Sequence, residues 1–178
     1  VFDFDGVLTT QTEEAQRVRE IFGLILLEKS GLTPEQVNEL ISYADVELIN
    51  HPHQHGWIDN GRIAAFANED IFMHNVGLAN CMDDSVQNGN ELANQALTTL
   101  KAAGYESFQA VSFAAYVQMT EETKKNLHNN PMDPYVKELF ENLLKEKHDI
   151  TLVSNSSTDR IVDLLKKVDI NIDDYQSD

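Results

Sequence analysis

The sequence begins with Val1-Phe-Asp-Phe-Asp-Gly-Val-Leu8, in which apolar and acidic residues alternate up to a glycine. Alternation with a period of two is typical of a strand, and a glycine permits a sharp turn where the strand ends. A second stretch, Asp149-Ile-Thr-Leu-Val-Ser-Asn155, is rich in the residues that parallel sheets bury on both faces. We therefore expect the end of a strand at the first stretch and a core strand at the second.

The residues between these two stretches are mostly helical in pattern, because their apolar side chains recur with the period of a helix. The segment from His51 to Asn60 has no such period and contains several helix-breaking residues, so we expect a loop there. Asn129 to Pro134 has the composition of a linker. The expected helices run from about Thr10 to Lys29, from Pro34 through Leu48, from about Asp84 to Ala103, from about Ser107 to Lys125, from Pro134 to Lys147 and from Ser156 through Val168.

This order of elements predicts an α/β fold with a Rossmann-like parallel-sheet core and a large, mostly helical inserted cap domain. The predicted core comprises residues 1–10 and 131–178, and the predicted helical cap comprises residues 11–130. The first strand begins abruptly at Val1, so we expect its start to be missing and the sequence to be a segment of a longer chain with an incomplete core.

Composition excludes several classes of protein. The formal net charge of -17 and the pI of about 4.5 would repel a nucleic-acid backbone, so nucleic-acid binding is not expected as the main function. The longest apolar run, from Ile21 to Leu27, is too short to cross a bilayer, and no membrane partner is expected. Cys81 is the only cysteine, so no internal disulfide is possible and we expect a reducing, cytoplasmic location.

Two carboxylates, Asp3 and Asp5, stand two residues apart at the expected strand end. Side chains with this spacing point to the same side of a strand, where they can share a cation such as Mg²⁺. The cation would offset the repulsion between the two carboxylates and the charge of an incoming phosphate. Gly6 would let the backbone turn so that its amides face the ligand. The alternative is a pair of solvated acidic side chains at a strand end.

The stretch Phe2-Asp-Phe-Asp-Gly-Val-Leu-Thr9 resembles the first signature of the haloacid dehalogenase superfamily, which reads Asp-x-Asp followed by Gly and Thr. The apolar strand ending in Ser154, preceded by a helix that begins at Pro134, is similar to the second motif of that family. The resemblance covers the two ends of the sequence and not its middle. The lysine of the third motif and the acids of the fourth are not matched, because Lys166-Lys167 follows Ser154 too closely and Asp173-Asp174 does not follow a buried strand.

The resemblance implies a magnesium-dependent phosphatase that acts on a small phosphorylated metabolite. Asp3 would attack phosphorus to form an aspartyl-phosphate, and Asp5 would protonate the leaving oxygen and then activate water. Mg²⁺ would be held by the Asp3 carboxylate and the backbone carbonyl of Asp5. Ser154 and the backbone amides of Phe4 and Asn155 would hold the phosphate.

Other functions remain open at this point. A phosphomutase of the same superfamily shares both aspartates, and a catalytically silent binding module would keep the fold without the missing motifs. Members that cleave carbon-halogen bonds lack the second aspartate, so Asp5 disfavours dehalogenation. His51, His53 and His55 lie on one side of an extended segment, where imidazoles can bind zinc, although incidental loop histidines are the more ordinary interpretation. Cys81 is either a nucleophile or a small buried residue. The sequence does not indicate an oligomeric state.

Overall fold

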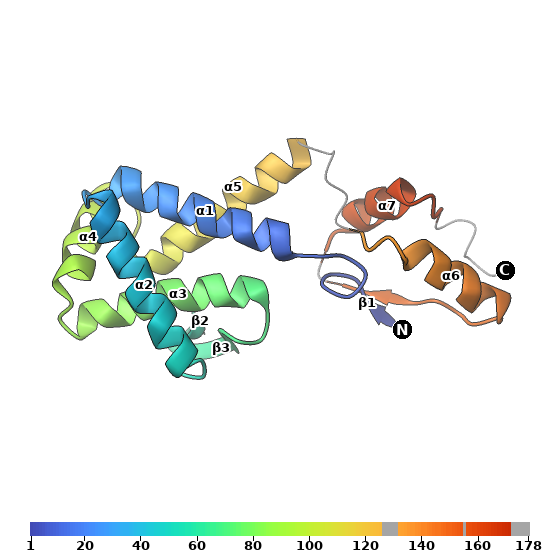
Figure 1. The fold of residues 1–178 in the computed structure, drawn as a ribbon, viewed down its shortest axis with the longest axis horizontal. Helices are drawn as coiled ribbons and strands as arrows, with labels where there is room; N and C mark the ends of the chain where they lie inside the picture. Colours follow the sequence, from blue (N-terminus) through green and yellow to red (C-terminus); the bar gives the residue numbers. More distant parts are fainter. Residues whose placement is uncertain (126–131, 155, 172–178) are drawn as a thin grey trace. The chain divides into compact units, whose positions relative to one another are not determined.

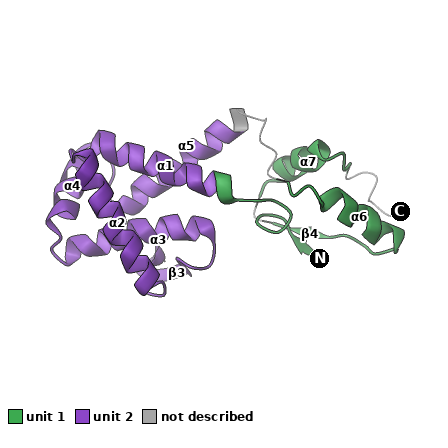
Figure 2. Cartoon of the chain, in the orientation of Figure 1, with its two compact units in different colours: residues 1–13, 126–178 green, residues 14–125 purple. Residues whose placement is uncertain are grey.

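The computed structural model describes residues 1–125, 132–154 and 156–171. The chain divides into two compact units, of which unit 1 comprises Val1–Glu13 with Asn126–Asp178 and unit 2 comprises Glu14–Lys125 (Figure 2). Most of the described residues are helical, and their named strands form two sheets of two strands each (Figure 1). The prediction of a Rossmann-like parallel-sheet core is therefore wrong.

Unit 1 is built around a pair of short parallel strands, β1 (Phe2–Asp3) and β4 (Leu152–Val153), with Phe2 opposite Leu152 and Asp3 opposite Val153. Phe2 and Leu152 pack against a buried cluster, whereas the side chain of Val153 is 59% exposed. The expected core strand over residues 149–155 is thus shorter than predicted and covered on one face. The cluster comprises Phe4, Leu8, Met132, Val136, Phe140, Leu164, Leu165 and Ile170.

Two helices supply half of that cluster, α6 (Val136–Lys145) with Val136 and Phe140 and α7 (Thr158–Lys167) with Leu164 and Leu165. The N-cap of α7 is Ser157, within the predicted capping segment, and its hydroxyl accepts a hydrogen bond from the Arg160 amide at 3.4 Å. The helix expected from Pro134 begins later, at Val136. Asp133 accepts a hydrogen bond from the Tyr135 amide at 2.9 Å and so closes the turn before the helix.

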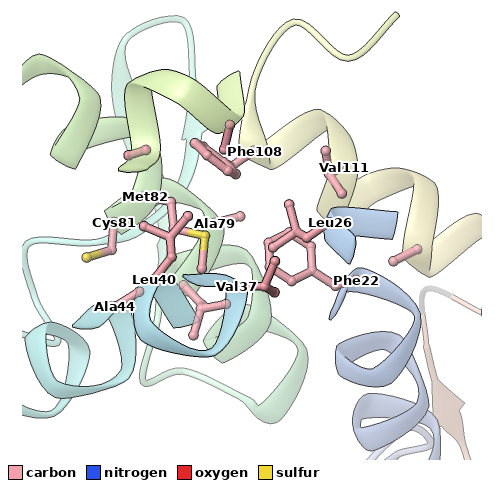
Figure 3. Close-up of a cluster of buried hydrophobic side chains, with 14 of the residues drawn as sticks. Phe22, Leu26, Val37, Leu40, Ala44, Ala79, Cys81, Met82, Phe108 and Val111 are labelled. Carbon is pink, nitrogen blue, oxygen red and sulfur yellow. The ribbon is translucent and has the colours of Figure 1, made fainter. Parts of the chain in front are cut away.

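Unit 2 is a helical unit with one β-hairpin. Its apolar core joins side chains from all five helices, and Figure 3 shows its central part, where Phe22 and Leu26 lie near Val37 and Val111. No helix in the described parts of the chain has both the length and the apolar character needed to cross a membrane. The helices are α1 (Thr12–Lys29), α2 (Pro34–Asn50), α3 (Ile71–Gln87), α4 (Glu91–Ala102) and α5 (Phe108–Lys125).

The helices α1 and α2 confirm the helices expected from about Thr10 to Lys29 and from Pro34 through Leu48. Both are predictable because the residues that start or end them are neighbours in the sequence. Gly31, at φ +72°, follows α1 where the sequence predicts a stop. Thr33 and Gln36 form a reciprocal capping box at the start of α2, in which each side chain bonds the backbone amide of the other residue.

The predicted loop from His51 to Asn60 is partly wrong, because residues 56–66 form a hairpin. Its strands are β2 (Gly56–Asp59) and β3 (Arg62–Phe66), which pair antiparallel. The connection is Asn60-Gly61, with φ of 48° and 73°. Positive φ at both central residues is the requirement of a type I′ turn, which Asn-Gly satisfies better than most dipeptides.

The single helix predicted from Asp84 to Ala103 is also wrong. The structure has α3 up to Gln87 and α4 from Glu91. Gly89 adopts a φ of 82°, which ends the first helix, and the Asn90 side chain accepts a hydrogen bond from the Ala93 amide at 3.0 Å, which starts the second. The helix expected from about Ser107 is confirmed as α5.

The helix α3 packs closely at Gly77 against Ala67, the residue directly after the hairpin. A Cβ atom added there would lie 2.3 Å from the Cβ of Ala67 and 3.1 Å from Cδ2 of Leu48. Gly23, in the middle of α1, has much more room, since an added Cβ would lie 4.0 Å from Cδ1 of Ile41. Replacement of each helical glycine by alanine therefore adds a methyl group in a crowded place at Gly77 and in a roomy place at Gly23.

We predict that Gly77→Ala lowers the free energy of unfolding by about 1 to 3 kcal/mol, because the added methyl group overpacks the contact with Ala67. The matched control Gly23→Ala should raise it by about 0.5 to 1 kcal/mol, because alanine restricts the unfolded chain. Urea unfolding followed by the fluorescence of Trp57 measures both. Two changes of the same sign would contradict the packing shown here.

The start of α5 is capped from a distance by Asp83 of α3. One carboxylate oxygen accepts a hydrogen bond from the Phe108 amide at 2.8 Å and the other from the Gln109 amide at 3.1 Å. Burial raises the pKa of Asp83 to about 6, and these two amide hydrogen bonds oppose part of that rise. The cap therefore carries a cost when the carboxyl group is ionised.

We predict a pH-dependent contribution from this carboxyl group. Below about pH 4 it is protonated in both the folded and the unfolded state, and as the pH rises through about 6 the folded state must ionise a half-buried group. The free energy of unfolding should fall by up to about 3 kcal/mol over this range. Asp83→Asn should lack this fall, so the difference between variant and wild type should change between pH 4 and pH 8. Parallel pH curves would exclude the effect, and Asp70→Asn, in the exposed cap of α3, reports the cost of losing an ordinary capping carboxylate.

Candidate functional site

The candidate site lies in unit 1, at the carboxyl ends of β1 and β4. Because these strands are parallel neighbours, the residues that follow them meet at the same edge of the sheet. Asp5 follows β1 and Ser154 follows β4. The hydroxyl of Ser154 donates a hydrogen bond to Oδ2 of Asp5 at 2.7 Å, so the structure brings together two residues of the predicted site that are far apart in the sequence.

Asp5 is the centre of a small polar network. The hydroxyl of Ser156 also donates to Oδ2, at 2.8 Å, and the Ser156 amide donates to the Ser154 hydroxyl at 2.8 Å. Nη1 of Arg160 lies 3.4 Å from Oδ1 of Asp5 and donates to the Ser156 hydroxyl at 3.1 Å. Oδ1 is buried and, within the described residues, accepts no hydrogen bond of good geometry, so Arg160 acts on it as a nearby charge.

Sequence reasoning missed Ser156 and Arg160. The signals that point to them are their positions, because Ser156 repeats the hydroxyl two residues after Ser154 and Arg160 lies in the first turn of the following helix. From the sequence alone, both residues are typical of the start of a helix. Their link to Asp5 depends on the pairing of two distant strands, which the local pattern does not show.

Asp3 and Phe4 occupy opposite sides of the chain. Asp3 is exposed at the end of β1, whereas Phe4 is fully buried in the apolar cluster of unit 1. The exposed carboxylate is thus open to a substrate from solvent. The amide of Phe4, which was expected to hold phosphate, donates to the carbonyl of Val153 at 3.2 Å and is occupied by the strand pairing. Asn155, the other predicted amide donor, lies outside the described residues.

The loop after Asp5 is fixed by Thr9. Gly6 has a φ of +80°, and its amide donates to the Thr9 hydroxyl at 3.2 Å rather than facing outward as expected. The Thr9 hydroxyl in turn donates to the Phe4 carbonyl at 3.5 Å, and the amide of Leu8 donates to the same carbonyl at 3.0 Å. The glycine and the threonine of the signature therefore shape the turn that places Asp5 beside Ser154.

The residues at this site match the donors that Mg²⁺ uses. Mg²⁺ is commonly bound by one or two carboxylates together with water and substrate phosphate. Asp3 supplies an exposed carboxylate and Asp5 would supply its backbone carbonyl, whereas Oδ1 of Asp5 is buried and lies 3.4 Å from Nη1 of Arg160. The described residues hold no group of three or more acidic, histidine or cysteine side chains placed to bind a metal, so such a site relies on the two aspartates and the substrate.

Within the described residues, His51, His53 and His55 are not part of any group of three or more side chains placed to hold a metal ion. His51 Nδ1 lies 2.8 Å from a carboxylate oxygen of Glu47, and His55 Nδ1 lies 3.2 Å from one of Asp84. The ring of His53 meets the edge of Phe66 at 6.0 Å between centroids. His55 Nε2 also lies 3.8 Å from the Glu47 oxygen that His51 contacts, whereas His53 packs against Phe66. This arrangement favours incidental histidines over the zinc triplet considered from the sequence.

Cys81 is buried in the interior of unit 2 and is only 2% exposed. Burial raises the pKa of its thiol to about 12, and the negative charges of Glu47 and Asp84 act in the same direction. A thiolate is the reactive form of cysteine, and this environment disfavours it. The structure thus supports the interpretation of Cys81 as a small buried residue.

No protein-family model, curated protein or solved structure matches the chain. The resemblance to the haloacid dehalogenase superfamily therefore rests on the two short motifs and on the geometry that joins Asp5 to Ser154.

We predict that the Cys81 thiol of the folded protein reacts at least about 100-fold more slowly with an aromatic disulfide reagent than in urea, because burial limits both access and ionisation. The rate of thiolate release at pH 8, measured with and without denaturant, tests this. Fast stoichiometric labelling of the folded protein would reopen the possibility that Cys81 is a nucleophile.

Proposed function

We propose that this chain belongs to a phosphatase-type hydrolase of the haloacid dehalogenase superfamily, which hydrolyses a small phosphorylated metabolite with Mg²⁺. The observation that carries the proposal is the 2.7 Å hydrogen bond from Ser154 to Asp5. The two motifs that resemble the superfamily were recognised separately, at the two ends of the sequence. Their meeting at one edge of a parallel strand pair is what a shared site requires.

The proposed reaction gives each residue a distinct role. The exposed carboxylate of Asp3 attacks phosphorus and the bond from phosphorus to the leaving oxygen breaks, giving an aspartyl-phosphate. Asp5 protonates the leaving oxygen and then accepts a proton from the water that hydrolyses the intermediate. Mg²⁺, held by the Asp3 carboxylate and the Asp5 backbone carbonyl, would supply positive charge beside the phosphate. Ser154 positions Asp5 and, by rotating its hydroxyl, can donate to a phosphate oxygen.

A second candidate is a catalytically silent binding module. It is favoured by the closed character of the network, because the Asp5 carboxylate is already engaged by two hydroxyl groups and a guanidinium. In that case the network would serve to hold the ends of β1 and β4 together. The two candidates differ in one measurable property, which is the release of inorganic phosphate.

We predict that the purified protein releases phosphate from an aryl phosphate in the presence of Mg²⁺ and loses this activity with a chelator. Asp3→Asn should lower turnover by about 10³-fold or more, because it removes the nucleophile but almost no volume. Asp163→Asn, an exposed aspartate on α7, is the matched control and should keep wild-type activity. Thermal melts of the three proteins check that they are equally folded.

Three results would count against the proposal. Activity that resists the chelator would exclude a requirement for Mg²⁺. Substantial activity of Asp3→Asn would exclude Asp3 as the nucleophile. A folded wild-type protein that releases no phosphate from a broad panel of phosphate esters would favour the binding module. Transfer of phosphate between positions of a sugar, without free phosphate, would instead indicate a phosphomutase.

A further inference from the structure

The residues beside Asp5 include a cation that the proposed reaction does not yet use. Arg160 places Nη1 3.1 Å from the Ser156 hydroxyl and 3.4 Å from Oδ1 of Asp5. Its side chain is 37% exposed, so the guanidinium reaches both the network and the solvent. The group is thus positioned at the boundary where a substrate would enter.

The negative charge of the site makes a cation beside it favourable for binding a phosphate. A phosphate ester that approaches Asp3 and Asp5 meets two carboxylates in a protein with a formal net charge of -17. Each carboxylate repels the phosphate, and Mg²⁺ offsets part of that repulsion. A guanidinium presents five N–H donors in a planar fork, which suits it to bind phosphate oxygens while it remains beside a carboxylate.

The local structure directs Arg160 toward the network. It lies in the first turn of α7, next to the N-cap Ser157, whose hydroxyl accepts a hydrogen bond from the Arg160 amide. The amides at the start of a helix also favour an anion. The Ser156 hydroxyl joins the guanidinium to Asp5, with 3.1 Å to the former and 2.8 Å to the latter.

We propose that Arg160 and Ser156 are phosphate-binding residues, which hold the phosphoryl oxygens of the substrate beside Asp3 and Asp5. This inference rests on the proposed function and extends its phosphate-binding set beyond Ser154. The competing explanation is that Arg160 serves only to position Asp5. The two explanations differ in which kinetic parameter they affect, because a phosphate-binding residue acts on substrate affinity and a positioning residue acts on turnover.

The test compares Arg160→Gln, Arg160→Lys and Ser156→Ala with the wild type in the full chain. For Arg160→Gln we expect the Michaelis constant for the aryl phosphate and the inhibition constant of inorganic phosphate to rise together, by about 10- to 100-fold. Arg160→Lys should recover part of this loss, because it keeps the charge but not the fork. Ser156→Ala should cause a smaller change in the same direction. Lys137→Gln removes a cation of the same unit that pairs with Asp169, and it should change neither constant.

A second measurement does not require turnover. Calorimetric titration of inorganic phosphate into the Mg²⁺-loaded protein should show binding by the wild type and a weaker affinity for Arg160→Gln. If the wild type binds phosphate in this way but hydrolyses no ester, the inference stands and the proposed function fails. If the wild type is active and Arg160→Gln lowers turnover while both constants stay unchanged, Arg160 only positions Asp5 and the inference is overturned. A wild type that neither binds phosphate nor releases it overturns both.

Discussion

Unit 1 depends on one non-local interaction, the parallel pairing of β1 with β4. The pairing is short, and its flanking hydrogen bonds include those from the amides of Phe2 and Phe4 to the carbonyls of Thr151 and Val153, at 2.8 and 3.2 Å. A few such bonds do not hold distant segments together by themselves, since each contributes about 1 kcal/mol net. The fully buried ring of Phe4 adds about 1.5 to 3 kcal/mol through the apolar surface that it removes from water. The position of every residue at the site follows from this combination.

The burial of Phe4 also explains why the two aspartates lie outside the apolar cluster, with Asp3 exposed and Asp5 partly exposed. Side chains alternate across an extended chain, so a phenylalanine that points into the core leaves its acidic neighbours on the outer side. The ion pair between Asp5 and Arg160 is then partly exposed, with side-chain exposures of 20% and 37%. Ion pairs of this kind contribute about 0 to 1 kcal/mol to stability. Stability is therefore a weak reason for the arginine to be there, which strengthens the case that it meets a ligand.

The sequence predicts those parts of the molecule whose causes are local. Thr33 and Gln36 define the start of α2 because a capping box needs only neighbouring residues. The Asn60-Gly61 turn is equally local, but the absence of a helical period around it indicates only a loop. The boundary at Gly89 and Asn90 is not evident from periodicity, because the apolar period continues across it. The site follows the same rule, since its aspartates form a recognisable motif while Arg160 joins them only through the pairing of distant strands.

The error in the fold class has a different physical origin. A short apolar run is compatible with a strand buried on both faces and with one covered on a single face, and local sequence does not distinguish them. Val153 faces away from the apolar cluster, at 59% exposure, so the described strand pair has only one covered side. The number of strands in a sheet depends on which segments pair, and that information is non-local.

Three polar side chains of α3 join this helix to neighbouring elements of unit 2. Asn80 accepts a hydrogen bond from the Gly56 amide at 3.1 Å and so ties the hairpin to α3, while Asn75 donates to the Ala15 carbonyl at 2.9 Å and ties α1 to the same helix. Asp83 does the same for the start of α5. Buried polar groups need partners, and here each partner is a backbone group of an adjoining element. Because these side chains already serve to join α3 to its neighbours, the case for chemistry rests on the exposed Asp3 and on the network around Asp5.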